Sequence, residues 1–315
     1  MMLGKTANGL FWMARYIERA ANTARLVETG QRMALVRQGE ARTEWRAITA
    51  AAGVSDGFDG RHGDAYDAPH VIDYLLRDPS NPSSAVSSIE SARTNARMVR
   101  TAITREMWEA VNEMYLDMRD VLAKPVDERD LPAVLDRLRR HGALIRGMMI
   151  GTMLRNAIFD FIELGLYTER ADNVARILDV KYHVLLPRAE EVGGTLDTAQ
   201  WEQLLYSVHV RRAYLHEYGA DYRADRVAEF LVLNPRMPRS LRFSTKRVAE
   251  HLDHLADETG HRTQVCDRAR ARVEAMDRRD IASVFADGLH EVLTDFIAEN
   301  AGLSNEIART YRFVE

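Results

Sequence analysis

The chain has 315 residues, which suits one large domain or two smaller ones. Hydrophobic residues make up 46% of the sequence and charged residues 29%, values that are ordinary for a folded globular protein and that exclude a disordered chain. The 43 basic and 47 acidic residues nearly balance, so the overall charge does not predict binding to nucleic acid or to an anionic membrane.

Cysteine use and hydropathy bear on the compartment. The single cysteine, Cys266, cannot form an internal disulfide and is typical of a reducing environment, so we expect a cytoplasmic protein. The first residues lack both the apolar run and the cleavage site of a signal peptide. The longest apolar stretch, residues 142–154, contains Arg146 and is too short to span a bilayer. We therefore expect no membrane segment.

Long runs of Ala, Leu, Arg and Glu without an alternating β pattern predict an all-α fold. Segments rich in Gly, Pro, Ser or Asp are expected to separate the helices at residues 53–64, 77–84, 123–132, 186–195 and 233–240. The helices between these breaks are long enough to form a helical bundle. Ser84 and Ser240 each precede an apolar periodicity and are predicted to begin helices.

The first predicted helix contains the stretch RYIERAANTAR, residues 15–25. At about 100° per residue, Arg15, Glu18, Asn22 and Arg25 fall on one polar stripe. Small and apolar residues fill a broad sector on another side of the same helix, and this sector is predicted to pack inward. Arg19 directly follows Glu18 and completes a Glu-Arg pair.

A second copy of this pattern, LYTERADNVAR, begins at residue 166 and again carries Glu, Arg and Asn at matching positions. The repeated residues are Glu169, Arg170, Asn173 and Arg176. Residues 15–28 and 166–179 are identical at seven of fourteen positions, at an offset of 151.

A second match strengthens this pattern. Pro79, Pro82 and Ser84 recur as Pro235, Pro238 and Ser240, at an offset of 156. Together the matches predict one domain of residues 1–315 built from two related helical halves of about 155 residues, near 1–155 and 156–315. Chance similarity between helical sequences is the alternative.

Three interpretations of the repeated stripe are open. It is a solvated helix face with weak ion pairs, a ligand or catalytic site, or a buried network in which the two stripes face each other. The recurrence of Asn, a mediocre helix former, favours the buried network. Arginine suits such a network because its planar fork pairs with a carboxylate at two points.

A group of basic residues surrounds the start of the helix predicted after Ser240. Helix N-termini favour anions, so this group is the best candidate for binding a phosphate, a carboxylate or an acidic partner. Capping and salt bridges to neighbouring acidic helices are the alternative. The five residues are Arg236, Arg239, Arg242, Lys246 and Arg247.

The run EHLDHLADETGH places His251, His254, Glu258 and His261 on one helical face. Two histidines and a carboxylate can bind zinc. The run lacks the spacing of metallopeptidases, and no Glu-x-x-His pair on a second helix completes a di-metal bundle. A hydrated surface is therefore favoured, and no metal or other cofactor is predicted.

The sequence offers little for catalysis. Cys266 lies in an ordinary amphipathic run, and neither a Gly-x-Ser-x-Gly nucleophile turn nor a Gly-rich phosphate loop is present. No catalytic residue is predicted, and the chain is not expected to be an enzyme by itself.

Five segments together resemble the bacterial Alpha-E family, a helical domain family with a conserved Glu-Arg motif. The motif corresponds to Glu18 and Arg19, and again to Glu169 and Arg170. The segments are residues 2–26, 81–112, 163–179, 230–243 and 289–313.

The resemblance implies a functional context. Members of the family are companions of a circularly permuted ATP-grasp protein, of a kind that makes amide bonds through acyl phosphates, and of a transglutaminase-like cysteine peptidase. The implied role is a non-catalytic accessory protein of a peptide or amide synthesis and processing system. The alternative is a catalytic component of that system, with Glu and Arg residues lining a site for an anionic substrate.

Overall fold

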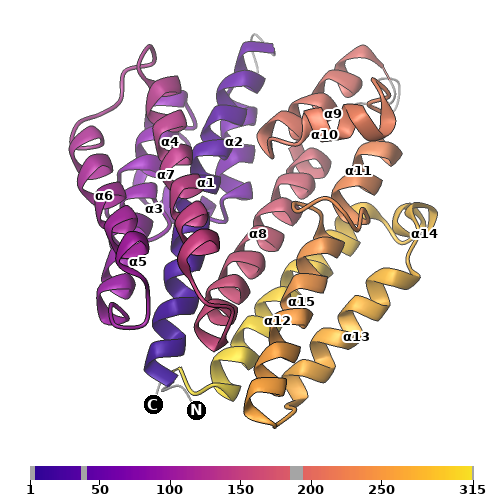
Figure 1. The fold of residues 1–315 in the computed structure, drawn as a ribbon. Coiled ribbons are helices and arrows are strands. Elements are labelled where there is room, and N and C mark those ends of the chain that lie inside the picture. Colours follow the sequence, from indigo (N-terminus) through magenta and orange to yellow (C-terminus); the bar gives the residue numbers. More distant parts are fainter. Residues whose placement is uncertain (1–3, 37–40, 185–193, 314–315) are drawn as a thin grey trace.

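The structure is a computed structural model that describes residues 4–36, 41–184 and 194–313. These residues form fifteen α-helices and no strand (Figure 1), which confirms the all-α prediction. In chain order the helices are α1 (Gly4–Val36), α2 (Ala41–Ala51), α3 (Ser55–His62), α4 (Ala68–Leu76), α5 (Ala85–Met98), α6 (Arg105–Val121), α7 (Leu131–Thr152), α8 (Ala157–Val184), α9 (Thr195–Ser207), α10 (Arg211–Tyr218), α11 (Ala224–Val232), α12 (Leu241–Thr259), α13 (Gln264–Arg278), α14 (Ile281–Ala286) and α15 (Leu289–Thr310).

Helices α1 and α8 lie side by side in the middle of the molecule (Figure 1). We call their line of contact the central seam. Along it Phe11 lies against Gly165, and further on Glu18 bonds to Arg170, so the two helices run in the same direction. On one side α1 packs against α5 and α7, and on the other α8 packs against α12 and α15.

The seam is close because small residues meet on it. Ala14 of α1 is buried and lies beside Gly165 of α8. Elsewhere on α1, Ala20 and Ala24 are fully buried, as the apolar sector of the sequence predicts. Gly165 of α8 leaves so little room that a Cβ atom there would lie 2.2 Å from the carbonyl oxygen of Phe11. Small residues at a helix crossing let the backbones approach each other.

The predicted helix starts at Ser84 and Ser240 are confirmed. The Ser84 side chain accepts a hydrogen bond from the backbone N–H of Ser87, and Ser240 accepts one from Phe243. Such N-caps satisfy donors that the first helical turn leaves free. The breaks predicted at 77–84 and 233–240 coincide with the connections before α5 and α12, and most of the break at 186–195 lies outside the described residues.

The break between helices predicted at residues 53–64 is wrong over most of its length. Residues Ser55–His62 form α3, despite the low helix propensity of Gly and Asp. The reason is aromatic packing: Phe58 is fully buried and contacts Tyr66 and Tyr74 at ring-centroid distances of 4.7 and 5.3 Å. Burying a large ring outweighs weak local propensity.

Three consecutive helices begin at a constant distance from three later helices. Helices α3 and α10 begin at Ser55 and Arg211, α4 and α11 at Ala68 and Ala224, and α5 and α12 at Ala85 and Leu241, in each case 156 residues apart. A glycine with positive φ ends both α3 and α10.

Within the described residues, no helix has both the length and the apolar character needed to cross a bilayer.

Candidate functional site

The two Glu-Arg motifs meet across the central seam. Arg170 of α8 donates two hydrogen bonds to Glu18 of α1, of 3.0 and 3.3 Å. Arg19 of α1 donates two to Glu169 of α8, of 2.6 and 3.1 Å. Each glutamate therefore accepts two hydrogen bonds from the arginine of the other motif. Such bidentate pairs between arginine and a carboxylate are among the strongest hydrogen bonds in proteins.

Both glutamates are buried, so a solvated helix face does not describe them. The exposed fraction is 1% for Glu18 and 6% for Glu169. Burial opposes the ionisation of Glu18, but Arg170, Arg146 and Arg239 together outweigh it and hold the pKa of its carboxyl well below the ordinary value. Glu18 is a buried anion.

Four arginines surround Glu18. Besides Arg170, Arg146 of α7 donates a hydrogen bond of 2.6 Å to Glu18, and the guanidinium of Arg239 lies 3.5 Å from the same carboxylate. Arg25 also acts on the Glu18 charge. We call these five residues the Glu18 cluster. Within the cluster one carboxylate faces four guanidiniums, and the buried carboxylate of Glu163 also acts on Arg170 and Arg146.

Arg25 is affected both by burial and by the neighbouring guanidiniums. Burial lowers its pKa to about 10, and the nearby charges of Arg170 and Arg146 act in the same direction against the attraction of Glu18. Three buried nitrogen atoms in and beside the cluster have no hydrogen-bond partner among the described residues. They are Nε of Arg25, Nε of Arg146 and Nδ2 of Asn22.

On the Glu169 side, the motif residues line a polar cavity of about 270 Å³, which we call the seam pocket. Arg15, in the wall of this pocket, donates hydrogen bonds to Glu169 (2.8 Å) and to Ser304 of α15 (3.0 Å). The pocket therefore brings together residues that the sequence predicts as a functional group. Those lining it are Arg15, Arg19, Asn22, Glu169, Asn173 and Arg176.

The five basic residues near the start of α12 face different partners. Arg239 joins the Glu18 cluster, whereas the others pair with acidic residues of their own surroundings, as in the salt-bridge alternative. The pairs are Arg236 with Glu217, Arg242 with Asp277, and both Lys246 and Arg247 with Glu250.

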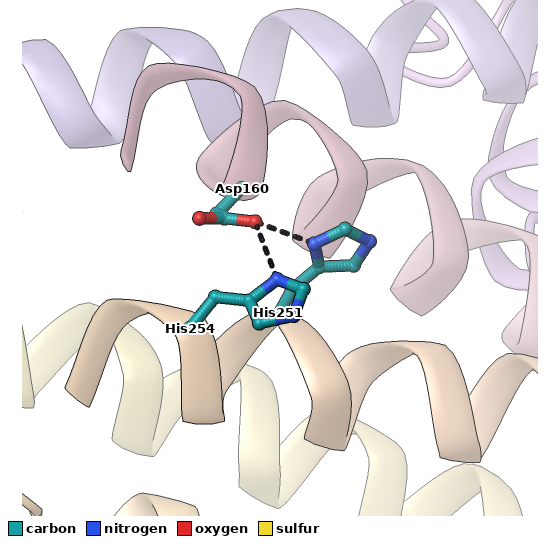
Figure 2. Close-up of side chains that lie close together, drawn as sticks. All are labelled: Asp160, His251 and His254. Carbon is teal, nitrogen blue, oxygen red and sulfur yellow. Dashed lines mark hydrogen bonds and ion pairs between the residues drawn. The ribbon is translucent and has the colours of Figure 1, made fainter. Parts of the chain in front are cut away.

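The histidine run of α12 divides into two parts. His251 and His254 face Asp160 of α8 (Figure 2). Glu258 instead accepts a hydrogen bond of 2.7 Å from the backbone N–H of Ala157, and His261 is exposed beyond the end of α12.

Sequence reasoning missed two members of these sites. Arg146 gave one signal, as the charge that interrupts an apolar stretch, but nothing pointed to Glu18 as its partner 128 residues away. Asp160 gave no signal at all, because it lies 91 residues before His251 and resembles any acidic residue in the first turn of a helix.

The Glu169 carboxylate predicts a pH dependence of stability. Burial opposes its ionisation, but Arg15 and Arg19 outweigh burial and lower its pKa. A lowered pKa in the folded state stabilises the fold above the unfolded value of about 4.3, and this stabilisation is lost as pH falls through the folded value. We expect the urea midpoint to fall from pH 5 to pH 3, and to fall less steeply for Glu169→Gln. Parallel pH profiles of the two proteins would contradict this.

A family model described as a predicted alpha-helical domain with a conserved ER motif matches residues 2–312. The chain is 25% identical over 314 residues to an uncharacterised protein of Mycobacterium bovis and to uncharacterised proteins of two strains of Mycobacterium tuberculosis. These alignments cover 93% of this chain and 35% of each relative, so the chain spans about a third of their length. No solved structure matches.

Proposed function

The chain belongs to the Alpha-E family, and on that premise we propose that it is a non-catalytic accessory protein of a peptide or amide synthesis and processing system. Its proposed partners are a circularly permuted ATP-grasp amide ligase and a transglutaminase-like peptidase. The family resemblance supplies these partners. The use of a single cysteine, buried as Cys266, fits a role in the cytoplasm.

One observation carries the proposal: the chain uses its family motif internally. Glu18 and Glu169 are buried, and each is held by the arginine of the other motif. A general acid or base works best with a pKa near the working pH and must reach its substrate. The pKa values of both carboxyls are lowered instead. These groups suit the joining of two helical halves better than proton transfer.

The two halves themselves support an origin by duplication. The constant spacing of α3 to α5 and α10 to α12 agrees with the offset of the Pro-x-x-Pro-x-Ser element. Equivalent aromatic pairs also share their geometry, since the rings of Phe58 and Tyr74 meet at 82°, as do those of Tyr214 and Phe230. We infer that the Glu-Arg motifs were retained in both copies because they fix the docking of one half on the other.

The mycobacterial relatives are consistent with an accessory role. In each of them the region similar to this chain makes up about a third of the protein. A domain that occurs within a longer polypeptide is suited to work beside other domains.

Binding between purified proteins tests the proposal. We expect the chain to form a complex with the ATP-grasp ligase in analytical ultracentrifugation, and to hydrolyse neither ATP nor peptides when it is alone. An unrelated helical protein of similar size and charge serves as the control. Absence of a complex at micromolar concentrations, together with turnover by the isolated chain, would overturn it.

The seam pocket favours a second candidate, a site for an anionic substrate. Arg15, Arg19 and Arg176 all line it, and guanidiniums bind carboxylates well. If this candidate holds, a dipeptide with a free carboxylate binds the chain in calorimetry and Arg176→Gln abolishes the binding. The matched control is Arg105→Gln, because both arginines sit in a helical pair four residues from an acid but Arg105 lies on the open surface. Equal binding of the dipeptide by both variants would exclude the seam pocket as its binding site.

A further inference from the structure

We propose that Asp160, His251 and His254 form a binding site for a divalent transition-metal ion of the zinc class. This proposal does not rest on the accessory role proposed above. We call the three residues the His-Asp cluster.

The side chains of the His-Asp cluster lie close together. Oδ1 of Asp160 lies 2.6 Å from Nδ1 of His251 and 3.4 Å from Nδ1 of His254 (Figure 2). The three atoms that would serve as ligands all lie within 4.8 Å of one another. The two histidines are three residues apart on α12, so one face of one helix presents both rings to α8.

Burial fixes two of the ligands. Asp160 is 4% exposed and His251 is 1% exposed, whereas the side chain of His254 is largely in solvent. A metal ion here would be held from the core on one side and would be open on the other. Three protein ligands with an open position are typical of reactive rather than structural zinc sites.

The second ring nitrogen of His251 has a suitable support. Its Nε2 atom lies 3.5 Å from Oε2 of Glu163, and a carboxylate behind a metal-bound histidine orients the ring. In the structure Nε2 also faces the Arg247 guanidinium at 2.9 Å, with Nδ1 toward Asp160. Metal on Nδ1 moves the ring proton to Nε2, which then donates to Glu163. Arg247 retains its contact with Glu250.

The cleft beside the His-Asp cluster favours a bound cation and leaves that cation accessible to a further ligand. The cluster borders a cleft of about 950 Å³, which also has the aromatic rings of Phe159, Tyr167 and Phe243 in its wall. Five acidic residues and three basic residues line this cleft, so it attracts positive charge. Imidazole ligands select zinc, cobalt, nickel or iron over magnesium and calcium.

The sequence predicts no metal because neither the spacing along α12 nor a Glu-x-x-His pair on a second helix indicates a metal site. The third ligand comes from α8, and only the packing of α8 against α12 brings Asp160 to the histidines. Glu258 and His261, the other residues of the histidine run, are not part of the cluster.

Cobalt binding tests the site. The full chain, free of any affinity tag and stripped with a chelator, is titrated with Co²⁺ and its visible absorption is recorded, followed by competition with Zn²⁺. We expect one equivalent of metal per chain and no response to Mg²⁺. His254→Ala removes an exposed ligand and should fold normally yet lose the bands, whereas His261→Ala, which removes an exposed histidine outside the cluster, should keep them.

Further variants separate the roles. Asp160→Asn should lose binding, and Glu163→Gln should weaken it roughly 10- to 100-fold, as loss of an orienting group does. Circular dichroism confirms that each variant is folded. Absence of the cobalt bands in the unaltered chain overturns the proposal, and so does equal binding by the unaltered chain and His254→Ala, which would place the metal on other surface groups.

Discussion

Replacing Glu18 by Gln is expected to lower the free energy of unfolding by about 3–5 kcal/mol, the usual cost of breaking a buried ion pair. The amide has nearly the shape of the carboxylate, so packing changes little. The charge, however, is lost, and the buried guanidiniums of Arg170 and Arg239 are left without their anion. Chemical denaturation at pH 7 measures the effect.

A surface pair provides the matched control. Glu109 pairs with Arg105 on the exposed face of α6, and Glu109→Gln should leave the denaturation midpoint within error of the unaltered chain. If Glu18→Gln is as harmless as Glu109→Gln, the motif does not hold α1 and α8 together. A double-mutant cycle with Arg170→Met measures the interaction free energy between Glu18 and Arg170. Removing both partners should cost less stability than the sum of the two single losses.

Gly165→Ala is expected to destabilise the protein by about 1–3 kcal/mol or more, the range for overpacked cores. The added methyl group would meet the backbone of Phe11, which cannot rotate out of the way as a flexible side chain can. The central seam would have to open, and the bonds between Glu18 and Arg170 would lengthen. Thermal and chemical denaturation report the loss.

Gly147→Ala is the control for this change, because Gly147 is also helical but a Cβ there meets nothing within 4 Å. Alanine is the better helix former, so this variant should be more stable by up to about 1 kcal/mol. Opposite signs for the two substitutions are the expected result. A gain of stability in both would mean that α1 and α8 are not in close contact at Gly165.

The Glu18 cluster costs desolvation free energy, because several guanidiniums are buried around one carboxylate. Replacing buried ion networks by apolar residues often leaves proteins equally stable, so stability alone does not account for this network. The two-point pairing of Glu18 with Arg170, and of Glu169 with Arg19, allows one register between α1 and α8. We interpret the repeated motif as the device that selects this register.

The sequence by itself determined the local features of this protein. The all-α class, the caps at Ser84 and Ser240, and the connections before α5 and α12 follow from propensities and capping that act within a turn or two. The polar stripe on α1 was equally predictable, because helical geometry alone places Glu18 and Asn22 on one side.

Only the tertiary structure decided which of these residues meet. Arg146 and Arg239 reach Glu18 from distant parts of the chain, Asp160 reaches His251 from another helix, and α3 forms because Phe58 finds a buried aromatic neighbourhood. The physical reason is the same in each case. Hydrogen bonds, ion pairs and ring contacts depend on distances in space, and the packing of α1, α8 and α12 sets those distances between residues that local patterns treat as unrelated.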